Sequence, residues 1–118
     1  MSTVRMITDI RVRDYASAVE VLTRAPEYIE QNLPGTLAWD VFADEAREHM
    51  TIYEEFADEL ALFEYEETLV GLGYRDELLQ YVDGARVVVL GPVSDPRVTE
   101  MLRRMDAPHR KLSVRVSR

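Results

Sequence analysis

The sequence predicts one α+β domain of the ferredoxin-like kind, with strands and helices in the order βαββαβ and the helices on one face of an antiparallel sheet. Three observations lead to this prediction. Residues 4–13 and 36–56 show the apolar–polar alternation of β-strands, broken by one polar turn. The segments between and after them carry apolar residues at helical spacing. The 118 residues are enough for a single domain, residues 1–118, with its own core.

The first expected strand, residues 4–13, is followed by an interrupted helix. Asp14 is a suitable N-cap because its short side chain can accept a hydrogen bond from the first helical turn. Pro26 should kink or restart the helix, since proline lacks the backbone N–H and clashes with the preceding turn. Pro34-Gly35 is typical of the segment that ends a helix.

Two further strands, residues 36–43 and 48–56, are expected to form a hairpin around a polar turn. The first is apolar on both faces, with Leu37 expected beside Trp39, so helices should cover one face and a partner sheet or a ligand the other. The second strand alternates between a polar, aromatic face and a more apolar one. The polar face, the better candidate for receiving a ligand, consists of His49, Thr51, Tyr53 and Glu55.

The remaining chain should complete the sheet and extend it. Asp58 is a credible N-cap for a helix whose apolar stripe includes Tyr65. Asp95 followed by proline is typical of another helix start. The later expected elements are a short helix at residues 74–82, a turn at Asp83-Gly84, a strand at 86–90, a helix from Asp95 to about Met105 and an edge strand at 111–116. Residues 4–92 would then form the core domain and residues 93–118 a C-terminal extension.

The charge and composition of the chain argue against several classes of binding partner. The net charge of −8 argues against nucleic acid, whose phosphates favour a basic surface. No apolar run is long enough to span a bilayer, and the first residues lack the apolar region of a signal peptide. Without cysteine the chain has no disulfide, no thiolate nucleophile and no cysteine metal site. We therefore expect a cytoplasmic protein without a membrane or nucleic-acid partner.

Three short motifs resemble a known family. They are Pro34-Gly35 before the second strand, the stretch YEEFADE at residues 53–59, and Gly91-Pro92 after a late strand. With the element order over residues 4–92, they make the chain similar to the antibiotic-biosynthesis-monooxygenase-like family of dimeric α+β-barrel proteins. The resemblance implies a homodimer whose two sheets close a barrel, with a cavity between sheet and helices. It also implies oxidation of aromatic phenols or quinols without metal or prosthetic group, or degradation of haem.

One departure from the family pattern limits this comparison. Many members carry a histidine in the helix after the acidic junction, and the matching position here is Tyr65. The histidine of haem-degrading relatives would fall near Gly71 to Gly73. Haem degradation is therefore disfavoured, because no imidazole is available there as an axial ligand.

The expected catalytic residues are His49, Tyr53 and Tyr65. An imidazole with a pKa near 6.5 suits a base that removes a phenolic proton, and the tyrosine hydroxyls could hydrogen-bond the substrate oxygen. The alternative for His49 is a solvated side chain beside a turn. The other histidine, His109, falls in an expected surface loop.

The expected substrate-binding residues begin with Trp39, a flat wall for an aromatic substrate or else a core or dimer contact. Its companions are Thr51, Phe63, Asp9 and Arg11. Asp9 and Arg11 would form an ion pair or substrate clamp if buried, and would be solvated if exposed. No metal site is expected, because neighbouring strand residues point to opposite faces. A helix cap and solvated faces account for Glu54, Glu55, Asp58 and Glu59.

By resemblance, the sequence predicts a small cofactor-independent monooxygenase that oxidises a polycyclic aromatic phenol, an anthrone or a quinol, as in aromatic polyketide antibiotic biosynthesis. Molecular oxygen would be the co-substrate, and no bound cofactor is expected. Two alternatives remain open. One is a non-catalytic binding dimer that shields an aromatic or hydrophobic metabolite. The other is a cyclase, which needs acid–base groups in the same pocket but no oxygen.

Overall fold

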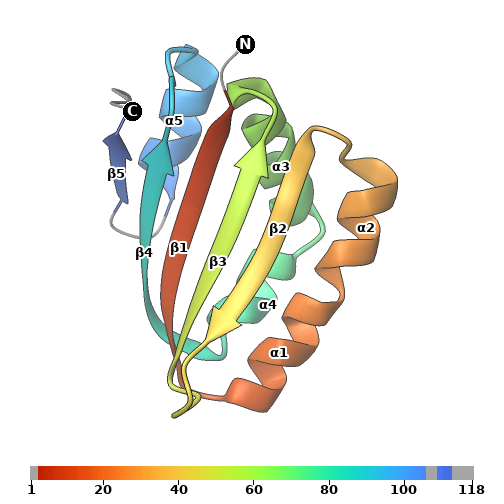
Figure 1. Ribbon diagram of the computed structural model, residues 1–118, viewed down its shortest axis with the longest axis vertical. Coiled ribbons are helices and arrows are strands. Elements are labelled where there is room, and N and C mark those ends of the chain that lie inside the picture. The colour runs from red at the N-terminus through yellow and green to blue at the C-terminus, as the bar shows by residue number, and fades with distance from the viewer. Residues whose placement is uncertain (1–2, 106–108, 113–118) are drawn as a thin grey trace, which may run out of the picture.

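The computed structural model describes residues 3–105 and 109–112, with side chains placed for residues 3–105. In these residues one twisted sheet carries all the helices on one face (Figure 1). No helix in the described ranges is long and apolar enough to cross a membrane. The elements are β1 Val4–Val12, α1 Tyr15–Thr23, α2 Ala25–Asn32, β2 Thr36–Ala43, β3 His49–Phe56, α3 Glu59–Gly71, α4 Tyr74–Leu79, β4 Val82–Leu90, α5 Pro96–Arg104 and β5 His109–Leu112.

The sheet confirms the expected fold class. Its strand order is β2-β3-β1-β4-β5, and each of the first four strands is antiparallel to its neighbours among them. The added strand β5 pairs in parallel with β4 at one edge, so the predicted C-terminal helix and strand are both present. β5 begins at His109, which we expected in a loop. Residues 113–116 of the expected last strand lie outside the described residues.

The predicted helix starts are confirmed. Pro26 stands in the first turn of α2, where its missing N–H costs nothing, so the chain ends one helix and starts another. Each predicted N-cap aspartate accepts a backbone N–H: Asp14 from Ser17 at 3.1 Å, Asp58 from Ala61 at 2.9 Å and Asp95 from Arg97 at 2.9 Å.

The predicted turn at Asp83-Gly84 is wrong. β4 begins at Val82, α4 ends at Leu79, and Gly84 lies opposite Arg11 of β1. Val82 and Gly84 pair with Val12 and Arg11 of β1, and that long-range gain outweighs the local preference of an Asp-Gly pair for a turn. The chain reverses just before the strand, where the Tyr81 N–H donates to the Leu78 carbonyl at 2.9 Å.

The predicted alternation at the start of β2 is also broken. The register between β2 and β3 shifts between Thr36 and Ala38, as at a β-bulge. Leu37 is consequently 55% exposed and does not share the buried side of Trp39. From Trp39 onward the alternation holds, and Trp39 and Val41 face the helices.

The core fills the space between the sheet and the helices. One apolar cluster gathers around Phe56, Leu62 and Val89 under α3 and α5. A second gathers around Ile10 and Met50 under α1. Trp39 packs against both clusters. The opposite face of the sheet has no covering element among the described residues (Figure 1).

Gly35 and Gly91, the glycines of two family-like motifs, allow neighbouring segments of the backbone to pack closely. A Cβ on Gly35 would lie 2.7 Å from the Cβ of Ala61, so only glycine lets β2 start this close to α3. Gly91 has a φ of +118°, and a Cβ there would lie 2.7 Å from the Thr3 carbonyl oxygen. Both motifs therefore serve the fold and need no catalytic explanation.

Candidate active site

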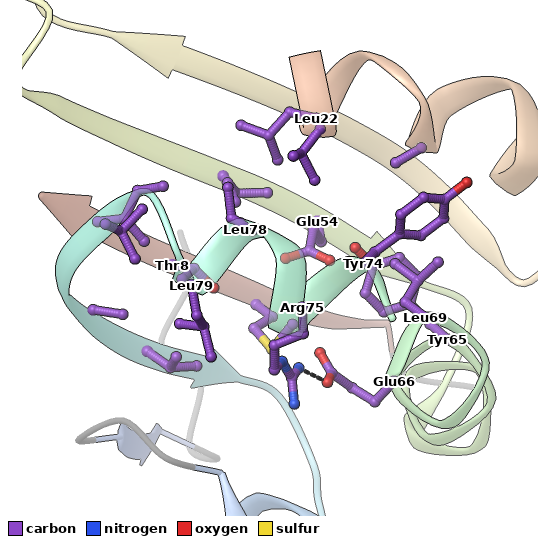
Figure 2. Close-up of a pocket in the computed structure, with 18 of the residues that line it drawn as sticks. Thr8, Leu22, Glu54, Tyr65, Glu66, Leu69, Tyr74, Arg75, Leu78 and Leu79 are labelled. Atoms are coloured by element: carbon purple, nitrogen blue, oxygen red, sulfur yellow. Dashed lines mark ion pairs between the residues drawn. The ribbon is translucent and has the colours of Figure 1, made fainter. Parts of the chain in front are cut away.

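A cavity of about 140 Å³ lies between the sheet and the helices, which we call the inner cavity. β1, β3 and β4 form its floor, and α1, α3 and α4 surround it (Figure 2). Most of the lining is aliphatic or aromatic. The polar side chains in it are those of Thr8, Glu54, Tyr65, Glu66, Tyr74 and Arg75.

Glu54 is the central polar group of the inner cavity. Glu54 lies on the same face of β3 as Met50, Ile52 and Phe56, at a spacing of two residues, so the strand directs it toward the helices. The side chain is 2% exposed, and its Oε2 has no hydrogen-bond partner. Burial raises the pKa of Glu54 to about 7, although a hydrogen bond with Tyr65 and the charge of Arg75 oppose that rise. A carboxyl of this kind exchanges a proton near neutral pH.

Tyr65 connects Glu54 to the aromatic wall of the cavity. It projects from α3 and is 6% exposed. Its hydroxyl accepts a hydrogen bond from Nε1 of Trp39 at 3.0 Å. Burial, with the negative charge of Glu54, raises the pKa of Tyr65 well above its usual value. The phenol therefore stays protonated at neutral pH and can donate a hydrogen bond.

An ion pair between Glu66 and Arg75 links α3 to α4 beside the inner cavity (Figure 2). Glu66 is 2% exposed, so its charge depends on this partner. Burial lowers the pKa of Arg75, yet a guanidinium stays charged in proteins. Arg75 therefore places a positive charge in the same cavity as Glu54.

The structure brings together two of the expected site residues, Trp39 and Tyr65, in the inner cavity. Phe63 lies two residues before Tyr65 in the sequence but does not line the cavity. It is half-buried against the first core cluster, and the guanidinium of Arg97 lies 5.7 Å from its ring centroid.

The other expected site residues lie on the open face of the sheet, away from the inner cavity. Their polar atoms contact one another and their neighbours. The contacts are Thr51 Oγ1 donating to Asp9 at 2.6 Å, Arg5 Nε donating to the Tyr53 hydroxyl at 3.0 Å, Tyr53 with Glu55 at 3.3 Å, and His49 with Asp44 at 3.2 Å. Arg11 is exposed on the same face. The sheet thus divides the expected residues into two groups.

Sequence reasoning missed three cavity residues, Glu54, Glu66 and Arg75. The expectation that Glu54 is solvated is wrong, because it is buried among apolar neighbours. A signal was present: a glutamate at the same two-residue spacing as Met50, Ile52 and Phe56 shares their buried face. Within the described ranges, no group of three or more histidine, aspartate or glutamate side chains is arranged to hold a metal ion.

Comparison with solved structures shows the same fold. A candidate antibiotic biosynthesis monooxygenase from Caulobacter crescentus CB15 has a TM-score of 0.69 and 15% identity over 79% of this chain and 92% of that chain. SnoaB, a cofactor-independent oxygenase from Streptomyces nogalater, has a TM-score of 0.68 and 11% identity over 81% of this chain and 98% of that one. MupZ from Pseudomonas fluorescens has a TM-score of 0.66 and 16% identity, and the match covers 99% of this chain and 94% of that chain.

No family model matches the chain, and no curated protein matches it. The likeness therefore rests on three-dimensional structure at low sequence identity, and it concerns the fold. It agrees with the motifs at Pro34-Gly35 and Gly91-Pro92, which serve backbone geometry. The chain has the fold of the antibiotic biosynthesis monooxygenases, which confirms at the level of fold the resemblance seen in its sequence.

Proposed function

We propose that the protein is a small monooxygenase that oxidises an electron-rich aromatic compound, a phenol, anthrone or quinol, with O2 as co-substrate and no metal or prosthetic group. The observation that carries this proposal is Glu54, a buried carboxyl with an unpaired oxygen and a pKa of about 7 inside an apolar cavity. The likeness to SnoaB, described as a cofactor-independent oxygenase, supports the same kind of chemistry.

Glu54 acts as the general base in this proposal. A base is most effective when its pKa lies near the working pH, and a pKa of about 7 meets that condition. Removing a proton from the substrate leaves an electron-rich anion that can reduce O2. Tyr65 remains protonated, and its single O–H, which donates to Glu54 while that carboxyl is ionised, can donate to the substrate oxygen once Glu54 has taken the proton.

The atoms and electrons balance without an added reductant. With anthrone, one oxygen atom of O2 bonds to the ring carbon and the other leaves as water with the two hydrogens of that carbon. The substrate supplies all four electrons that O2 accepts, and the product is anthraquinone. Glu54 first takes one proton and then returns it to the departing oxygen. The apolar lining excludes bulk water from the reactive intermediate.

We further propose that the open face of the sheet pairs with a second copy of the chain. Four apolar side chains there remain partly or largely exposed: Ile7, Val88, Leu90 and Phe42, the last at 62%. Packing two such faces would bury them. Sedimentation equilibrium at micromolar concentration tests this proposal, and a monomer under those conditions would contradict it.

A cyclase is the second candidate function. The same Glu54 and Tyr65 pair could move protons during a ring closure, and that reaction needs no O2. Non-catalytic binding of an aromatic metabolite is the third candidate function. An experiment must distinguish it from the monooxygenase and the cyclase. The three functions differ in oxygen consumption and in covalent change of the ligand.

An oxygen electrode separates the candidates. Wild-type protein is mixed with anthrone or 1,4-hydroquinone, and the products are analysed by mass spectrometry under ¹⁸O2. We expect one labelled oxygen atom per product and stoichiometric O2 uptake, both abolished in Glu54→Gln. Glu64→Gln, at an exposed position of α3, is the matched control and should retain the rate. Saturable binding without oxygen uptake would reject the monooxygenase.

A further inference from the structure

A second depression lies beside the inner cavity, between the α1–α2 segment and the helix-facing side of β2. We call it the outer groove, and its volume is about 400 Å³. Leu22 and Trp39 are the two residues that line both spaces. The inner cavity and the outer groove are therefore neighbours that share one wall.

The two residues of this wall, Trp39 and Leu22, are held in place by different kinds of contact. Trp39 is fixed, because its indole Nε1 is hydrogen-bonded to Tyr65 at 3.0 Å. Leu22 projects from α1, is 9% exposed and belongs to the second apolar cluster. A leucine side chain can change rotamer without breaking a hydrogen bond. A rotamer change at Leu22 would therefore cost no side-chain hydrogen bond, whereas displacing Trp39 would break one.

The volumes of the two spaces indicate how large a ligand each could hold. An apolar cavity of about 150 Å³ accommodates benzene, so the inner cavity at about 140 Å³ holds roughly one ring. Pockets that bind larger organic ligands measure about 300–1,000 Å³. The inner cavity falls below that range by itself, and it reaches the range only together with the outer groove.

We propose that the outer groove is a second substrate subsite, which holds the fused ring or apolar arm of an aromatic substrate whose reacting ring lies beside Glu54. Leu22 and Trp39 then determine which substrates can extend from one space to the other. This inference rests on the proposed function, since it assigns the reacting ring to the inner cavity.

The residues that line the outer groove indicate what kind of substrate arm would fit there. Its surface is formed largely by Tyr15, Val19, Pro26, Val41 and Met50, which favour an uncharged, flat or aliphatic group. Asp40 and Thr23 are exposed at its margin. A carboxylate at the margin disfavours an anionic arm by charge repulsion. The expected substrate is therefore a neutral, multi-ring or alkyl-substituted hydroxyarene.

Trp39 provides the readout, because it is the one tryptophan of the chain and lies between the two spaces. Its fluorescence is titrated anaerobically with 1,4-hydroquinone, which has one ring, and with anthrone, which has three fused rings. Val19→Phe narrows the groove without altering the inner cavity. We expect it to raise the Kd of anthrone about tenfold and that of hydroquinone less than about twofold.

Val70→Phe is the matched control, at a position that is 46% exposed on α3 and lines neither space. Both Kd values should remain unchanged in it. If circular dichroism shows that Val19→Phe is unfolded, Thr23→Phe at the exposed groove margin should give the same selective loss.

The subsite is rejected if wild-type protein does not bind anthrone, or if the groove variants weaken both ligands equally or neither. Failure of the proposed function has a different signature. In that case the selective binding pattern persists, and the same compounds consume no oxygen when air is admitted.

Discussion

The indole Nε1 of Trp39 donates a hydrogen bond to the hydroxyl of Tyr65 across 3.0 Å and so joins β2 to α3. The ring of Tyr65 also packs edge-on against Phe56, with centroids 5.1 Å apart. This arrangement fixes one wall of the inner cavity and places a phenol next to Glu54.

Replacing Tyr65 by phenylalanine should therefore destabilise the protein. The Trp39 N–H would lose its acceptor, and a buried unsatisfied donor costs about 1–3 kcal/mol. Urea denaturation measures the free energy of unfolding, and Trp39 emission reports the change around the indole. Tyr53→Phe on the open face is the control, and its partly exposed contacts should contribute less than about 1 kcal/mol. Equal losses in both variants would contradict the assigned role of the hydrogen bond.

Glu54 should make the stability of the protein fall as pH rises. Its pKa is about 7 in the folded chain against 4.5 when exposed, so the folded state binds the extra proton between those values. The contribution of Glu54 is most favourable below pH 4.5 and is lost progressively up to about pH 7, by up to about 3 kcal/mol. Glu54→Gln should remove this slope and be more stable than wild type at pH 8.5.

Denaturation at pH 5.5 and pH 8.5 measures that difference, with Glu64→Gln as the exposed control. The control should reproduce the wild-type change in the free energy of unfolding between the two pH values. An unaltered slope in Glu54→Gln would show that this carboxyl titrates normally.

The rate of oxygen uptake should rise with pH through about 7, since only ionised Glu54 can accept the substrate proton. Below that value the rate should change by about tenfold per pH unit. Glu54→Gln should lower the rate by about 10²–10⁴-fold. A pH–rate profile under air-saturated conditions gives both results.

His49→Ala separates the two candidate bases of β3. His49 is exposed on the open face and contacts Asp44, whereas Glu54 faces the inner cavity. We expect His49→Ala to keep a rate within about twofold of wild type, because removing a proton requires hydrogen-bond reach to the substrate. A large loss of oxygen uptake in His49→Ala with full retention in Glu54→Gln would move the site to the open face.

Gly35→Ala should destabilise the fold without touching the inner cavity. The added methyl group would lie 2.7 Å from the Cβ of Ala61, and overpacking of this kind costs about 1–3 kcal/mol. Gly71→Ala is the control, since a Cβ there meets no atom within 4 Å and its position in α3 favours alanine. Adding Ala61→Gly to Gly35→Ala should restore part of the loss, which a double-mutant cycle measures. Strict additivity would show that the two residues do not interact.

Local patterns predicted most of the fold. The three aspartate N-caps, the helix restart at Pro26 and the strand periods depend on residues near one another in sequence. Sequence reasoning failed where a distant partner decided the outcome. Pairing with β1 drew Asp83 and Gly84 into β4, and a register shift between Thr36 and Ala38 left Leu37 exposed.

The candidate site, like the fold, could be predicted only in part from local sequence patterns. From the amino-acid sequence alone, alternate residues of β3 could be assigned to opposite faces, because a strand has a period of two. The apolar residues of β3 also indicated which face is buried, but not that this face borders a cavity, since the cavity depends on contacts among α1, α3, α4 and the sheet. The tertiary structure decided this by burying Glu54 beside Tyr65 and Arg75 and leaving His49 exposed. Burial is a property of packed neighbours, so the raised pKa that makes Glu54 a candidate base arises only in the folded chain.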